Sequence, residues 1–104
     1  MREALFIYTT VATVADAQKL AQELLEQQLI ACANIIPVNS CYVWEGKQAN
    51  DNECGIVFKT LPEMGHLVEQ ALAKIHPYKV PCITAFPVRV NDKFAAWIEE
   101  SVKK

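Results

Sequence analysis

The chain has 104 residues, of which 52% are hydrophobic and 21% charged, and its formal net charge is −2. This composition excludes a disordered chain, and the scattered lysines and arginines argue against electrostatic binding to nucleic acid. No apolar run approaches the roughly 18 residues that a membrane-spanning helix needs, and the N-terminus resembles a strand more than a signal peptide. We therefore expect one soluble, cytoplasmic domain over residues 1–104, with no membrane partner.

Four cysteines are present, but none forms a Cys-x-x-Cys pair and no export signal accompanies them. Reduced thiols are therefore expected. All four fall in strand-like segments, where a free cysteine usually behaves as a small hydrophobic residue. We expect such a packing role for Cys32, Cys41 and Cys54, whereas Cys82 is considered below for chemistry.

The chain begins with a predicted strand and a predicted helix. Residues 4–11 are rich in β-branched and aromatic side chains, which favours a strand. Residues 13–16 have capping-box spacing ahead of a helical apolar stripe. This stripe consists of Ala17, Leu20, Ala21, Leu24 and Leu25.

A hairpin is predicted next. Residues 30–38 and 42–47 are strand-like, either as two strands or as one long bent strand. Pro37 cannot donate to a strand ladder, so it marks a bulge or a sheet edge. The run Asn-Asp-Asn at 50–52 predicts the turn, and residues 54–60 the returning strand.

The second half repeats the pattern of helix and strand. Residues 60–63 again have capping-box spacing, and the helix that follows should end before Pro77. Residues 82–90 predict the fourth strand. Asn91 is the expected cap of a final helix, whose C-terminal end suits the basic residues 103–104.

This order, βαββαβ plus a C-terminal helix, predicts an α+β fold of the ferredoxin-like, split βαβ type with a four-stranded antiparallel sheet. Right-handed crossovers place the first two helices on one face of the sheet. The other face should be polar in a monomer, yet residues 30–38 and 82–90 carry apolar side chains on both faces. A symmetric oligomer is therefore expected.

Two clusters of unusual residues, 42–47 and 76–81, are not explained by core packing alone. In the first, Glu45 and Lys47 fit a solvated hairpin tip as well as a functional site, because exposed ion pairs are common and weak. Gly46 fits a bulge.

In the second cluster, His76 lies at a predicted helix end, where the dipole favours a positive charge and a structural role is plausible. His76 and Cys82 together suit copper or zinc, although two ligands from one chain do not close a metal site. An enzyme using His76 as general base or Cys82 as nucleophile is the least supported reading, since no catalytic motif is present. We predict that the chain is not an enzyme.

The chain resembles the CutA divalent-cation tolerance family over nearly its whole length. The resemblance is carried by Ala-Cys-Ala-Asn-Ile-Ile-Pro at 31–37, Trp-Glu-Gly-Lys at 44–47, Lys-Thr at 59–60, His-Pro-Tyr at 76–78, Val-Pro at 80–81, and Trp97. It implies a homotrimer of ferredoxin-like subunits that is linked to tolerance of copper and other divalent cations. It also implies a cleft between subunits that is lined by the shared motifs.

Carried over to this chain, the resemblance implies a ligand-binding cleft and a metal pair. The implied cleft residues are Asn34, Trp44, Glu45, Lys47, Lys59 and Tyr78, and the implied metal ligands are His76 and Cys82. Cys82 stands where the family usually has Glu, which would favour softer metals. Other departures are Lys79 in place of Glu or Gln, Phe94 in place of Tyr, and Thr9 where some relatives have Cys.

The predicted function is a cation-responsive homotrimer that binds copper or another divalent metal ion, with no obligatory cofactor. The alternative is a metal-independent signalling or scaffold trimer resembling PII proteins. Such a trimer would bind a small anionic ligand through Lys47 and Lys59. The short predicted hairpin tip at 48–52 counts against a PII-like partner loop.

Overall fold

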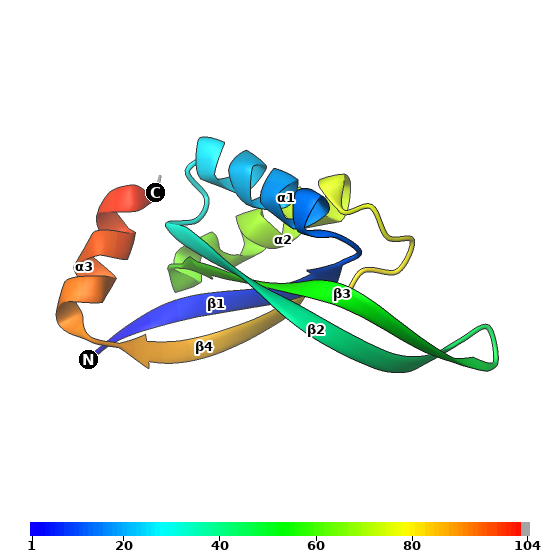
Figure 1. Cartoon of the computed structure of the whole chain (residues 1–104). Coiled ribbons are helices and arrows are strands. Elements are labelled where there is room, and N and C mark those ends of the chain that lie inside the picture. Colours follow the sequence, from blue (N-terminus) through cyan, green and yellow to red (C-terminus); the bar gives the residue numbers. More distant parts are fainter. Residues whose placement is uncertain (103–104) are drawn as a thin grey trace.

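A four-stranded antiparallel sheet with strand order β2-β3-β1-β4 spans the molecule (Figure 1). The computed structural model describes residues 1–102. Its elements are β1 (Arg2–Val11), α1 (Val14–Glu26), β2 (Cys32–Trp44), β3 (Lys47–Thr60), a 3-10 turn (Pro62–Met64), α2 (Gly65–Ile75), β4 (Thr84–Val90) and α3 (Asp92–Ser101). The α+β class, the antiparallel sheet and the βαββαβ order with a C-terminal helix are confirmed.

The core lies between the sheet and the two helices α1 and α2, which cover the same face (Figure 1). The first helix begins as predicted, because the Thr13 hydroxyl accepts a hydrogen bond from the Asp16 backbone N–H at 3.1 Å. Large side chains from both layers are fully buried, among them Ile7, Leu24, Ile56, Phe58, Val68 and Leu72. This core fixes the sheet on which the candidate site is built.

The opposite face of the sheet, which we call the open face, carries apolar side chains that α1 and α2 do not cover. Ile36 on β2 and Phe86 on β4 are 45% and 49% exposed. At one end of this face Phe94 of α3 meets Lys59, whose ammonium lies 5.5 Å from the ring centroid. The predicted two-sided apolar sheet is therefore present, and one chain leaves its open face to solvent.

The hairpin differs from the prediction. β2 is one long strand at the sheet edge, as Pro37 allows, and it pairs with β3 without a bulge from Cys32 and Lys59 to Trp44 and Lys47. The turn is formed by Glu45 and Gly46, which have φ angles of 51° and 79°. Positive φ at both positions is typical of a two-residue type I′ hairpin turn.

The Asn-Asp-Asn turn predicted at 50–52 and the bulge predicted at Gly46 are therefore wrong. Asn50 and Asn52 lie within β3 and hydrogen-bond the Asn39 side chain across the ladder, at 3.1 Å in each case. These residues are polar because the distal part of the hairpin extends beyond the helices, where residues 41–48 are all exposed. We call residues 39–52 the arm (Figure 1).

Smaller differences concern helix starts and β4. Thr60 does not cap α2, because its hydroxyl donates to the Leu29 carbonyl at 2.7 Å and a 3-10 turn intervenes. Asn91 makes no side-chain capping bond to α3. β4 begins at Thr84, so Cys82 lies in the preceding loop and is exposed. The predicted role of Lys103 and Lys104 lies outside the described residues.

None of the helices in residues 1–102 is long and apolar enough to span a bilayer.

Candidate functional site

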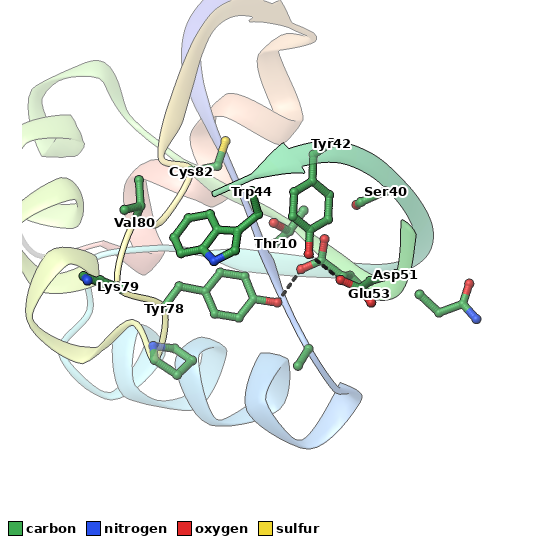
Figure 2. A pocket seen from close by; sticks show the side chains of 13 residues that line it. Thr10, Ser40, Tyr42, Trp44, Asp51, Glu53, Tyr78, Lys79, Val80 and Cys82 are labelled. Atoms are coloured by element: carbon green, nitrogen blue, oxygen red, sulfur yellow. Dashed lines mark hydrogen bonds between the residues drawn. The ribbon is translucent and has the colours of Figure 1, made fainter. Parts of the chain in front are cut away.

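A pocket of about 830 Å³ lies between the arm and the loop that joins α2 to β4 (Figure 2). The arm and the adjoining strand positions provide one wall, and the loop at 77–82 provides the other. Its lining residues are Thr10, Ala12, Ser40, Tyr42, Trp44, Asp51, Asn52, Glu53, Pro77, Tyr78, Lys79, Val80 and Cys82. Figure 2 shows the rings of Tyr42, Trp44 and Tyr78 grouped around this space.

Two tyrosine–carboxylate hydrogen bonds organise the pocket. The Tyr42 hydroxyl donates to Asp51, and the Tyr78 hydroxyl donates to Glu53 (Figure 2). The bond to Asp51 raises the pKa of Tyr42. Burial and the bond to Glu53 raise the pKa of Tyr78 well above its usual range. Both phenols are therefore held protonated, as hydrogen-bond donors to ionised carboxylates.

His76 is buried directly behind the pocket and has both ring nitrogens in hydrogen bonds. Its Nδ1 accepts from the Tyr78 backbone N–H at 3.1 Å, and its Nε2 donates to the Thr10 carbonyl at 3.0 Å. These partners define a neutral ring with the proton on Nε2. Burial lowers the pKa of His76, and the bond to Thr10 opposes part of that shift.

Thr9 attaches the pocket loop to the sheet. Its hydroxyl lies 2.9 Å from His76 Nε2 and donates to the Cys82 carbonyl at 2.5 Å. Since Thr9 is fully buried in β1, this pair of contacts fixes both ends of the 76–82 loop on one strand. The residue that stands where some relatives have cysteine thus has a positioning role here.

Three of the predicted site residues, Trp44, Tyr78 and Cys82, line the pocket. Glu45 and Lys47 do not, because they lie in and beside the turn at the tip of the arm.

Asn34 and Lys59 lie on the sheet, away from the pocket. Asn34 pairs with Val57 in the ladder. Lys59 is six residues from Glu53 along β3, about 20 Å at ~3.3 Å per residue. Its ammonium sits 5.2 Å from the Phe6 ring centroid, a cation–π contact that ties it to the open face. One chain does not bring these two residues to the other candidates.

The two carboxylates, Asp51 and Glu53, were missed as site residues in the sequence. The predicted turn at 50–52 includes Asp51, and Glu53 falls between that turn and the strand predicted from residue 54, so neither residue has an assigned face. Once the turn is placed at 45–46, strand alternation puts Asp51 opposite Ser40 and Glu53 opposite Val38, on the same face as Tyr42. The sequence signal that could have revealed this register is Gly46 between two strand-like runs, because glycine readily adopts the positive φ of a two-residue hairpin turn.

The predicted His76–Cys82 metal pair stays a prediction. The Cys82 thiol is exposed and lies 3.3 Å from the Thr84 hydroxyl, while His76 is engaged as described above. Within residues 1–102, no group of three or more His, Cys, Asp or Glu side chains could hold a metal ion. One described chain therefore does not complete a metal site.

Comparison with known proteins gives consistent matches. The family model of the CutA1 divalent ion tolerance protein matches residues 5–101. The divalent-cation tolerance protein CutA of Archaeoglobus fulgidus is 38% identical over 99 residues, covering 94% of this chain and 97% of that protein. That of Pyrococcus horikoshii is 36% identical over 101 residues, covering 96% and 99%.

Solved structures agree with the fold. The CutA1 divalent ion tolerance protein of Ehrlichia chaffeensis matches with a TM-score of 0.91 and 39% identity, over 97% of this chain and 96% of that one. The A. fulgidus CutA structure, described as periplasmic, matches with a TM-score of 0.92 and 38% identity, over 96% and 99%. The chain therefore belongs to the CutA1 divalent ion tolerance protein family.

Proposed function

We propose that this chain is the subunit of a homotrimer that binds copper or another divalent cation in the course of divalent-cation tolerance. The observation that carries the proposal is the exposed Cys82 thiol in the same pocket as Asp51 and Glu53. A thiolate is a soft ligand that selects copper and zinc over magnesium or calcium. Membership of a family named for divalent-ion tolerance supports it.

The metal proposal requires an assembly of several copies, because one described chain supplies too few ligands to complete a metal site. On the open face Ile36 and Phe86 are about half exposed, and another apolar surface is needed to bury them. A closed symmetric assembly would cover it and would bring pocket residues of one copy near those of the next. Asn34, Glu45, Lys47 and Lys59 are proposed to join the cleft only in this way.

His76 is the proposed second ligand, but one of its ring nitrogens must first be freed from its hydrogen bond. A metal ion binds a deprotonated imidazole nitrogen. Nδ1 would therefore have to give up the Tyr78 N–H before it could ligate. Metal binding through His76 would accordingly change the backbone around Tyr78, whereas binding through Cys82 alone would not.

Titrations with Cu(I) and with the divalent ion Zn(II), each against a chromophoric chelator and under reducing conditions, test the metal proposal. We expect Cys82→Ser to weaken binding at least tenfold. Cys41 is exposed, so the packing role predicted for it is wrong. Cys41→Ser is therefore the matched control, because this exposed thiol does not line the pocket. Identical copper binding by the wild type and a Cys82→Ser, His76→Gln double variant would refute the assigned ligands.

A second candidate function is favoured by the size of the pocket. About 830 Å³ with three aromatic side chains is far more room than a metal ion fills, and the volume lies in the size range of sites for small organic molecules. This is the metal-independent ligand-binding trimer. A thermal-shift screen separates the two functions, since a ligand that binds only the folded state raises its apparent stability.

We also propose a cytoplasmic location and no enzymatic activity. The four cysteines are free thiols, which fits a reducing compartment. Within residues 1–102, no hydrogen bond joins the Cys82 thiol to an imidazole, so a thiol–base pair does not support catalysis. Cell fractionation followed by thiol labelling would check the location, and fully oxidised cysteines would contradict it.

A further inference from the structure

The pocket contains negative charge that the described chain does not balance. Asp51 and Glu53 each accept a hydrogen bond from a neutral tyrosine hydroxyl. The two ion pairs found in residues 1–102 lie elsewhere, at Met1–Asp92 and Arg2–Glu99. A hydrogen bond from a neutral phenol orients a carboxylate but leaves its charge in place. This end of the pocket therefore favours a cation.

Lys79 is the one cationic side chain among the lining residues, which all lie within the described part of the chain. Figure 2 shows its ammonium at the opposite side of the pocket from Asp51 and Glu53. It forms no ion pair with either carboxylate. The pocket is thus polarised, with two carboxylates at one end and a single ammonium at the other.

Aromatic rings lie beside the carboxylate end. Tyr42 and Trp44 are 41% and 46% exposed, and Tyr78 joins them in Figure 2. The face of an aromatic ring is negative, so Trp and Tyr attract ammonium groups, most strongly when the cation is weakly hydrated. The protonated phenols, by contrast, are poor metal ligands. The carboxylate end with its aromatic rings therefore suits an organic cation, whereas the metal proposal rests on the Cys82 thiol.

We propose that this pocket binds a small organic ammonium ligand, with its cationic head against Tyr42, Trp44 and Tyr78 and its charge balanced by Asp51 and Glu53. The inference names the ligand class for the second candidate function and rests on it. It differs from the anionic ligand expected at Lys47 and Lys59, neither of which lines the pocket within one chain.

Three ligands of one shape test the sign of the charge. Choline carries a positive head, 3,3-dimethyl-1-butanol is its neutral carbon counterpart, and 3,3-dimethylbutyrate keeps the neutral head but carries a negative charge at the other end. Isothermal titration of the metal-free, full-length protein should give a dissociation constant for choline on the order of 1 mM or tighter. We expect binding of the neutral analogue to be at least tenfold weaker, and of the anion weaker still.

Two pairs of variants locate the binding. Trp44→Leu removes an aromatic face. Glu53→Gln removes a charge while keeping a hydrogen-bond acceptor for Tyr78. Each variant should weaken choline binding about tenfold. Trp97→Leu and Glu100→Gln are matched controls on α3, outside the pocket, and should bind choline as the wild type does. Thermal unfolding of each variant confirms that it is folded.

The outcomes separate this inference from the function on which it rests. Equal or tighter binding of the neutral or anionic analogue would overturn the ammonium ligand while supporting a ligand-binding pocket. Absence of binding by all three, together with an unresponsive thermal-shift screen, would overturn both. Choline binding that survives Trp44→Leu and Glu53→Gln unchanged would place the cation elsewhere and also refute the inference.

Discussion

His76 shows how a residue type can be recognised in a sequence while its role depends on its neighbours. The sequence predicts a histidine at a helix end with a possible metal role. The structure surrounds it with a carbonyl, a hydroxyl and a backbone N–H, so that both nitrogens are engaged. Those partners come from β1 and from the loop after α2. Such long-range contacts leave no pattern in the local sequence.

Burial of His76 predicts a pH-dependent stability in the metal-free protein. Because its folded-state pKa is lowered, the unfolded chain takes up a proton first as pH falls below about 6.5. The free energy of unfolding should therefore be lower at pH 5 than at pH 7.5. Urea unfolding of His76→Gln should show a smaller loss over this range than the wild type.

A control is needed because carboxylates also titrate as pH falls. The exposed His66 on α2 provides it, since the His66→Gln variant makes the same substitution without removing the buried ring. His66→Gln should keep the wild-type difference between pH 5 and pH 7.5. If His76→Gln keeps it as well, the buried ring is not the source of the pH dependence.

The Tyr78 hydroxyl should contribute measurably to stability through Glu53. Tyr78→Phe removes a hydrogen bond to a charged acceptor in a half-buried position, and we expect a loss of about 1 kcal/mol in the free energy of unfolding. Tyr8→Phe is the comparison, because no hydrogen bond of the Tyr8 hydroxyl is found within residues 1–102. Equal effects in denaturant unfolding would argue against the Glu53 bond.

At the scale of elements, periodicity and capping signals predict the strands and helices well where they border the core. Ala17, Leu20, Ala21 and Leu24 of the α1 stripe are buried as predicted, whereas Leu25 is 43% exposed, so the stripe is narrower than predicted. The Thr13 cap forms. Prediction fails in the arm, where Asn50 and Asp51 resemble a turn. Beyond the helices both faces of a hairpin meet water, so polarity no longer distinguishes a turn from a strand. The pocket carboxylates were missed for the same reason.

Gly46 provides a test of the observed turn. Its φ of 79° is unfavourable for alanine, while its surroundings leave room for a side chain. Gly46→Ala should therefore lower the free energy of unfolding by about 1 kcal/mol through backbone strain alone. Gly46→Asn should cost less, because asparagine tolerates positive φ. Equal losses for both variants in denaturant unfolding would contradict a type I′ turn here.

At the scale of the whole molecule, the sequence predicts the two-sided apolar sheet, and the structure leaves the same face uncovered. In the proposed trimer the remaining predicted site residues would meet only across copies. Asn34 and Lys59 lie on the open face and Lys47 at the arm tip, all apart from the pocket. A site assembled from several copies is encoded in the surfaces of each, not in the contacts within one.

Charges placed on the open face should prevent assembly. An Ile36→Glu, Phe86→Glu double variant buries two carboxylates wherever copies meet, and we expect light scattering to report monomers where the wild type gives trimers. Leu67→Glu is the control, because Leu67 on α2 is similarly exposed at 47% but lies on the helix layer. Circular dichroism should show all of these variants folded. A wild-type monomer would refute the trimer itself.

The arm would link assembly to ligand binding in the proposed trimer. It supplies Ser40, Tyr42, Trp44 and Asp51 to the pocket, yet it is a two-stranded ribbon whose residues 41–48 are exposed. Such a ribbon is only marginally ordered alone. Neighbouring copies and a pocket ligand would both favour its ordered form. Thermodynamic reciprocity then requires that a ligand which tightens the trimer by some factor is itself bound more tightly, by that same factor, in the trimer.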